Sequence, residues 1–285
     1  MIIRMKNENG TFEIGGGKHV SARLQQITGL GLVSKAIQSL TYSQMPGRVI
    51  TSERASERTI TLKFDYYADP ETVIRFFKIL QKPMKLELLR NGYYREIDCR
   101  VIAGAENNNI VYHHWEEMTL QLECSDPYFR GAVRRESIVS ATDMLPNVFE
   151  NSDWYIQLPA VATVRHQDAL IMNDGDAIVY PTITVENLAD TTGAKTDTIT
   201  ITINDRVLKI YHHAAVDETV TFNLERRMIT SSVDGDITNQ ISDDTVLSDM
   251  YYAEGSNVVT VTSSLTGDNL YAVSRYSPLY GMAVI

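Results

Sequence analysis

The sequence has few cysteines, no long apolar segment and no signal-peptide pattern, the features that define several large classes of protein. Its 285 residues include only two cysteines, which cannot build a disulfide framework or, by themselves, a tetrahedral zinc site. No segment approaches the ~20 apolar residues that a membrane-spanning helix needs. The first residues lack the apolar core and small-residue cleavage site of a signal peptide. We therefore expect no disulfide framework and no membrane insertion.

Positive charge is scarce in the second half of the chain. The net charge of -10 argues against a simple nucleic-acid binder, and we expect no sequence-specific binding to nucleic acid. Residues 1–135 hold 19 Lys and Arg against 15 Asp and Glu, a net of +4. Residues 136–285 hold 7 against 21, a net of -14. This swing predicts two domains with different partners, 1–135 and 136–285.

Helix signals are concentrated at one place. Asp69 is suited to cap a helix N-terminus, and Pro70 is suited to the first helical position. Apolar residues then recur at helical spacing, at Val73, Phe76, Phe77 and Leu80. Pro83 ends the pattern. The sequence predicts a single amphipathic helix over 69–82.

The rest of the first half alternates between apolar and polar residues, as half-buried strands do. The predicted strands are 58–64, 84–88, 94–101 and 112–124. Asn91-Gly92 is a strong hairpin signal between the second and third of these strands. Residues 44–56 differ, because a Pro46-Gly47 turn and many charges predict an extended, exposed arm.

The second half shows no helical stripe. It contains short runs rich in Val, Ile and Thr, at 179–186, 197–203, 219–224 and 258–262. Clusters of Asn, Asp and Gly separate these runs. Many short alternating strands with such turns predict an antiparallel sandwich, so the whole chain is expected to be mainly β.

No catalytic or metal-binding pattern emerges. The histidine pairs 113–114 and 212–213 lie in or beside predicted strands, where neighbouring side chains point to opposite faces, and no metal-binding motif accompanies them. We interpret them, and His166, as ordinary surface or packing residues. The acidic turns 174–176, 234–236 and 243–244 lack the 12-residue calcium-loop pattern. We expect no enzyme, no cofactor and no metal site.

Cys99 and Cys124 both lie in predicted strands, and an arrangement in which they face each other across a sheet stays open. We favour two buried, reduced thiols, because free cysteine behaves as a small hydrophobe. A Cys/His nucleophilic pair stays open as an alternative.

Six segments, in the same order along the chain, carry a family resemblance. The most specific is the strand 122–125 ending in the turn Asp126-Pro127-Tyr128-Phe129. The others are 43–48 with 57–62, the helix 69–81 with the hairpin 86–101, and the weaker segments 180–187, 253–261 and 275–280. The sequence thereby resembles the distal tail proteins of long, non-contractile-tailed bacteriophages and related prophages. Residues 135–178 and 225–250 show no such likeness.

The resemblance implies a fold and a structural role. It implies an N-terminal β-barrel-like or split-sheet domain and a C-terminal galectin-like sandwich. It further implies a virion protein, assembled in the bacterial cytoplasm, whose hexameric ring joins the tail tube protein to the baseplate hub and holds a receptor-binding protein. The implied interface arm contains Gln44, Pro46, Gly47, Arg48 and Arg58.

A second hypothesis treats the sandwich as a carbohydrate-binding module for host cell-wall glycans. Its motive is the sandwich pattern together with aromatic residues suited to stacking on a sugar, namely Trp154, Tyr155, Tyr251 and Tyr252. Because fold does not determine function, the sandwich alone does not decide between the two hypotheses.

Overall fold

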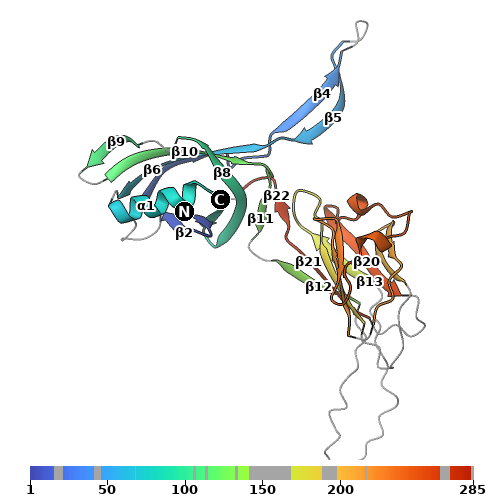
Figure 1. Ribbon diagram of the computed structural model, residues 1–285. Helices are drawn as coiled ribbons and strands as arrows, with labels where there is room; N and C mark the ends of the chain where they lie inside the picture. Colours follow the sequence, from blue (N-terminus) through green and yellow to red (C-terminus); the bar gives the residue numbers. More distant parts are fainter. Residues whose placement is uncertain are drawn as a thin grey trace, which may run out of the picture. The chain divides into compact units, whose positions relative to one another are not determined.

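The chain forms two compact units in the computed structural model (Figure 1). Unit 1 comprises Met1–Ala132 together with Leu279–Ile285, and unit 2 comprises Val133–Pro278. The structure describes residues 1–15, 22–41, 46–67, 69–104, 107–112, 115–131, 134–140, 168–187, 198–215, 217–263 and 270–283. The sequence-based division gave all of 136–285 to the second domain, whereas the contacts assign the last seven residues to unit 1.

Unit 1 contains a ten-stranded antiparallel sheet with the main order β2-β1-β7-β8-β10-β6-β3. These strands are β1 (Ile2–Asn7), β2 (Gly10–Ile14), β3 (Ala22–Thr28), β6 (Arg58–Tyr67), β7 (Met84–Arg90), β8 (Tyr93–Ala103) and β10 (Trp115–Cys124). Three further strands join beside them: β9 (Asn107–Tyr112), β11 (Phe129–Gly131) and β22 (Leu279–Tyr280). The N–H of Gly15 donates to the carbonyl of Ala22 at 3.0 Å, which connects the two outer strands β2 and β3. The sheet is thereby barrel-like.

The helix α1 (Pro70–Leu80) completes the core of unit 1. Its N-cap is Asp69, whose carboxylate accepts the N–H of Thr72 at 2.9 Å. Phe76 is fully buried, and its ring lies 4.2 Å from that of Phe12 and 6.0 Å from that of Phe64, measured between centroids. The single helix predicted from the sequence is confirmed, with its apolar stripe packed on the sheet.

The predicted strands of unit 1 are also present. The hairpin between β7 and β8 turns at Asn91-Gly92, where both residues have positive φ, 52° and 84°. Two-residue turns of this kind match the twist of the strands that they join. The predicted strand 112–124 is observed as β10, and β9 pairs beside it.

Unit 2 is a sandwich of two antiparallel sheets. The six-stranded sheet runs β12-β21-β14-β17-β18-β19, and the four-stranded sheet runs β13-β20-β15-β16. The first contains β12 (Arg135–Ser140), β21 (Leu270–Tyr276), β14 (Thr182–Asn187), β17 (Thr219–Asn223), β18 (Met228–Ser231) and β19 (Gly235–Asp236). The second contains β13 (Asp168–Asn173), β20 (Gly255–Ser263), β15 (Ile199–Ile203) and β16 (Arg206–Ile210).

Alternating burial along these strands gives each sheet one inward apolar face, as in other sandwiches. The sheets are connected by the hydroxyl of Tyr276, which donates to the carbonyl of Met172 at 2.8 Å. The only helical elements described in unit 2 are the short 3-10 turns Thr238–Gln240 and Leu247–Asp249. The predicted mainly β fold with a C-terminal sandwich is confirmed.

No helix in the described residues is long and apolar enough to cross a membrane.

The Asp69 cap generates a test of the helix boundary. Replacing Asp69 with Ala removes the acceptor for the Thr72 N–H, and we expect unit 1 to lose about 1 kcal/mol of unfolding free energy. Asp69→Asn keeps an acceptor and should recover most of the loss. Urea unfolding of the three proteins measures the difference, and equal midpoints for the Ala and Asn variants would contradict this capping role.

Candidate functional site

A two-stranded hairpin forms its own sheet within unit 1. It consists of β4 (Lys35–Leu40) and β5 (Val49–Ala55), which pair with each other and with no other described strand. Figure 1 shows both strands extending away from the main sheet of unit 1. We call residues 35–55 the arm. The sequence placed the arm at 44–56, so it anticipated β5 and the turn but not the first strand.

The arm exposes apolar side chains on both faces. Leu40 and Val49 are cross-strand partners on one face and are 52% and 47% exposed. Ile50 follows Val49, so it lies on the other face, and it is 54% exposed. Of the residues predicted to form the arm, Pro46, Gly47 and Arg48 are exposed near its tip, and Gln44 lies outside the described residues. A two-stranded hairpin without a core is marginally stable alone, so this surface is suited to contact a partner.

Arg58 is buried at the base of the arm and is not part of its surface. Only 6% of the residue is exposed, and its guanidinium donates to four backbone carbonyls. These acceptors are Pro127 at 2.7 Å, Gly29 at 2.6 Å, Gly31 at 2.8 Å and Gly281 at 2.6 Å. We call Arg58 and these acceptors the Arg58 cluster. It joins the start of β6 to three segments that are far apart in the sequence.

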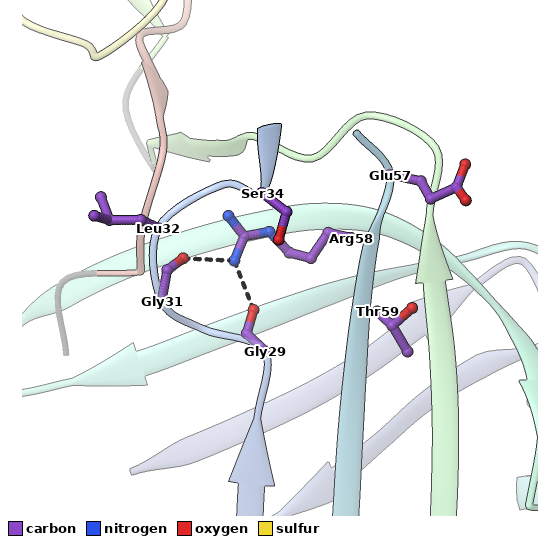
Figure 2. A pocket seen from close by; sticks show the side chains of 7 residues that line it. All are labelled: Gly29, Gly31, Leu32, Ser34, Glu57, Arg58 and Thr59. Atoms are coloured by element: carbon purple, nitrogen blue, oxygen red, sulfur yellow. Dashed lines mark hydrogen bonds between the residues drawn. The ribbon is translucent and has the colours of Figure 1, made fainter. Parts of the chain in front are cut away.

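The geometry of the cluster depends on a glycine. Figure 2 shows the carbonyls of Gly29 and Gly31 directed at the guanidinium, while Glu57 and Thr59 point away from it. Gly29 has φ +86°, and a Cβ there would lie 2.1 Å from the carbonyl oxygen of Thr59. Only glycine fits this close approach. These residues line a pocket of about 230 Å³.

The turn Asp126-Pro127-Tyr128-Phe129 belongs to the same cluster. The Asp126 carboxylate accepts the N–H of Tyr128 at 3.1 Å, which fixes the turn. The carbonyl of Pro127 then accepts from Arg58, and the ring of Phe129 lies 4.6 Å below the guanidinium carbon. β11 begins at Phe129 and pairs with β22. The structure thus brings together Arg58 and the turn, which the sequence had treated as separate features.

Both cysteines are buried close to this cluster. Cys124 is the cross-strand partner of Arg58, from β10 to β6. Continuing the β10–β8 register by one residue beyond Glu123 and Arg100 places Cys99 opposite Cys124. Both thiols are free. Burial lowers the pKa of the Arg58 guanidinium, and the thiolate form of Cys124 opposes that shift.

One group of described residues in unit 2 has the composition of a metal site. Ligand atoms of His212, Glu218 and Asp234 lie within 4.8 Å of one another. However, His212 Nε2 already contacts the Glu218 carboxylate at 2.6 Å, and Nδ1 contacts the side-chain oxygen of Gln240 at 2.8 Å. We interpret His212 and Glu218 as members of a buried hydrogen-bond network that holds the β16–β17 connection, whereas Asp234 is exposed. In this interpretation His212 is a packing residue.

Burial alone would raise the pKa of the Glu218 carboxyl group. The hydrogen bonds that it accepts from Ser231, His212 and the Ala215 N–H outweigh burial and hold its pKa below the usual value. A carboxylate in this state stabilises the fold as long as it stays ionised.

The aromatic residues suggested for sugar stacking do not form an open platform in the described part of unit 2. Tyr252 is fully buried and contacts Ser274 through its hydroxyl group. The ring of Tyr251 lies 6.0 Å from that of Tyr180, and the guanidinium carbon of Arg206 lies 3.9 Å from its centroid. Trp154 and Tyr155, like His113, His114 and His166, lie outside the described residues.

Comparison with solved structures shows which known proteins have a similar fold. The structure is similar to the crystal structure of the SPP1 Dit protein, described as a paradigm of the hub adsorption apparatus in phages that infect Gram-positive bacteria. The TM-score is 0.62 at 13% identity, over 91% of this chain and 93% of that one. The chain shares the fold of the SPP1 Dit protein. The likeness to the distal tail family seen in the sequence is thus confirmed at the level of fold.

Two further structures share this Dit-like fold. Both are of the phage P2 baseplate in its activated conformation, one with Ca and one with Sr. Each gives a TM-score of 0.51 at 8% identity; the first covers 99% of both chains, and the second covers 96% of this chain and 97% of that one. The sequence matches no protein-family description and no curated protein.

The Arg58 cluster predicts a large loss of stability when the side chain is removed. Arg58→Ala leaves four carbonyls without their donor, and those of Pro127 and Gly281 are buried, so we expect the change to cost about 3 kcal/mol or more. Arg58→Lys retains the charge but not the planar set of donors, so it should recover only part of the loss. Urea unfolding measures both variants.

Arg48→Ala is the matched control, because Arg48 is an exposed arginine of the arm. We expect this change to cost less than about 0.5 kcal/mol. Equal losses for the Arg48 and Arg58 variants would contradict the role of the cluster.

The Glu218 network predicts a specific pH dependence. Because the folded pKa lies below the ordinary value of 4.5, the contribution of Glu218 is complete above that pH and is lost as the pH falls through the folded pKa. Glu218→Gln should be less stable than wild type at neutral pH and should lose less stability than wild type in acid. Thermal unfolding between about pH 7 and pH 3 compares the two proteins. Parallel curves would contradict the prediction.

Proposed function

We propose that this protein is a structural component of a phage tail tip. In this proposal six copies form a ring through unit 1, which joins the tail tube protein to the baseplate hub. Unit 2 faces outward and holds adsorption components such as a receptor-binding protein. The observation that carries the proposal is the arm, an exposed apolar hairpin without a core, on a chain with a Dit-like fold. In this role the protein is not an enzyme, and it resides in the virion after assembly in the host cytoplasm.

The arm is suited to contact a second copy of the same chain. Its exposed apolar residues on both faces gain stability only when another surface covers them. A head-to-tail contact repeated around a closed ring covers every arm without leaving a free one. The Arg58 cluster supports this role because it makes the base of the arm rigid while the hairpin itself stays exposed.

The charges of the two units fit different surroundings. With Arg134 and Arg135 counted in unit 2, unit 1 has a net charge of +2 and unit 2 a net charge of -12. A nearly neutral unit packs against copies of itself without strong repulsion. A strongly acidic unit suits a soluble outer position or a basic partner. This asymmetry supports the division of roles.

Removing the arm tests the ring. The N–H of Ser56 donates to the carbonyl of Ser34 at 2.9 Å, so a short glycine linker from 34 to 56 can replace the arm without stretching unit 1. We expect wild type to form hexamers and the arm-less protein to form smaller species. Light scattering coupled to size exclusion, with negative-stain images, measures the difference.

A double point variant tests the same contact without removing the arm. Leu40→Asp with Val49→Asp places two charges on the apolar face of the arm and should give the same loss of hexamers. Ile74→Asp is the matched control, because Ile74 is 58% exposed on α1, outside the arm. Intact hexamers without the arm would contradict its assignment, and a monomeric wild type at all concentrations would contradict the ring.

A further inference from the structure

The buried cysteine pair lies in a setting that favours chemistry, in a part of unit 1 that the proposed function does not use. β10 lies between β6 and β8, so Cys124 has Arg58 as its partner on one side and Cys99 as its neighbour on the other. Cys124 is fully buried, and Cys99 is 6% exposed. The three side chains therefore form a row across three neighbouring strands.

The guanidinium of Arg58 has an unusual environment for a buried cation. The four acceptors described above are neutral backbone carbonyls, and none is a carboxylate. A buried positive charge favours a negative group nearby. Cys124 is the neighbouring group whose ionised form raises the pKa of Arg58.

The two thiols are not equivalent. Cys124 lies between Cys99 and Arg58 on the neighbouring strands, and the interaction with the Cys99 thiol and the positive charge of Arg58 together lower the pKa of Cys124 below its ordinary value despite burial. The interaction with Cys124, together with burial, raises the pKa of Cys99, which lies one strand further from Arg58. Cys124 is thus the better nucleophile, and Cys99 remains a thiol beside it.

We propose that Cys124 and Cys99 form a peroxide-reactive dithiol that closes to a disulfide between β10 and β8. In the first step the Cys124 thiolate attacks one oxygen of hydrogen peroxide, the O–O bond breaks, and Cys124 sulfenic acid and hydroxide form. In the second step the Cys99 sulfur attacks the Cys124 sulfur, and its proton leaves with the sulfenic oxygen as water. Both cysteines are oxidised, and one peroxide is reduced to water.

The backbone geometry permits a disulfide bond between Cys99 and Cys124. Opposite residues of an antiparallel pair have Cα atoms about 4.5 to 5.5 Å apart, within the range that disulfides span. Burial decides which oxidant reacts, because hydrogen peroxide can enter through local openings whereas bulky thiol reagents cannot. The product links two central strands of unit 1 and is independent of any assembly of the chain.

Mass spectrometry of the native protein treated with hydrogen peroxide tests the proposal. We expect wild type to lose the mass of two hydrogens and to show no free thiol after unfolding, while iodoacetamide leaves the native protein unlabelled. Cys99→Ser lacks the second thiol, so it should stop at a Cys124 sulfenic acid that dimedone traps. Cys124→Ser should lower the rate of thiol oxidation at least about tenfold, because the remaining Cys99 is buried, which raises its pKa, and lies one strand further from the Arg58 charge.

The asymmetry between the two variants separates a reactive pair from a merely packed one. Cys99→Ala and Cys124→Ala repeat the comparison without a new hydroxyl group, and thermal unfolding confirms that each variant is folded. Retention of both thiols in peroxide-treated wild type would overturn the proposal. Equal rates in the two single variants, or oxidation of wild type to sulfinic acid without a disulfide, would also overturn it.

Discussion

The buried guanidinium of Arg58 is the interaction on which the organisation of unit 1 depends. A cation at this depth is tolerated only when its donors are matched, and four carbonyls from three separate loops supply that match. Each carbonyl must therefore stand at a fixed position. This requirement explains the left-handed backbone at Gly29 and the tight turn at Asp126. Loops that would otherwise vary are held in one arrangement.

In contrast to the buried Arg58 cluster, the arm consists of exposed strands. It has a ladder of backbone pairs with one irregularity between Gln38 and Ser39, and the ion pair between Lys35 and Glu53, but no side chain of β4 or β5 is buried. Exposed ion pairs add little to stability. The chain thus combines a base with fixed geometry and an extension that has no buried side chains in its two strands. That combination supports the proposed contact between the arm and a second copy of the chain.

Sequence reasoning found the elements that local chemistry determines. The helix follows from Asp69, Pro70 and its apolar spacing, and the hairpin follows from Asn91-Gly92. The sandwich follows from alternation along short strands. The arm was only half recognised, because β4 has neither a turn signal nor a buried face to give it a pattern. The burial of Arg58 was missed because its acceptors are backbone carbonyls, which no side-chain motif reveals. The sequence left open whether the two cysteines face each other across a sheet, and it gave no sign that Arg58 lies beside Cys124.

The position of the last carbonyl of the cluster has a consequence for biosynthesis. Gly281 lies 223 residues after Arg58, and the whole of unit 2 is made between them. A ribosome that has finished β6 and β10 has therefore not yet supplied the fourth acceptor, and β11 still lacks its partner β22. Unit 1 reaches its complete hydrogen-bonded state only after unit 2 has emerged. A chain interrupted anywhere within unit 2 therefore carries the arm on an incomplete base, without the Gly281 acceptor and without β22.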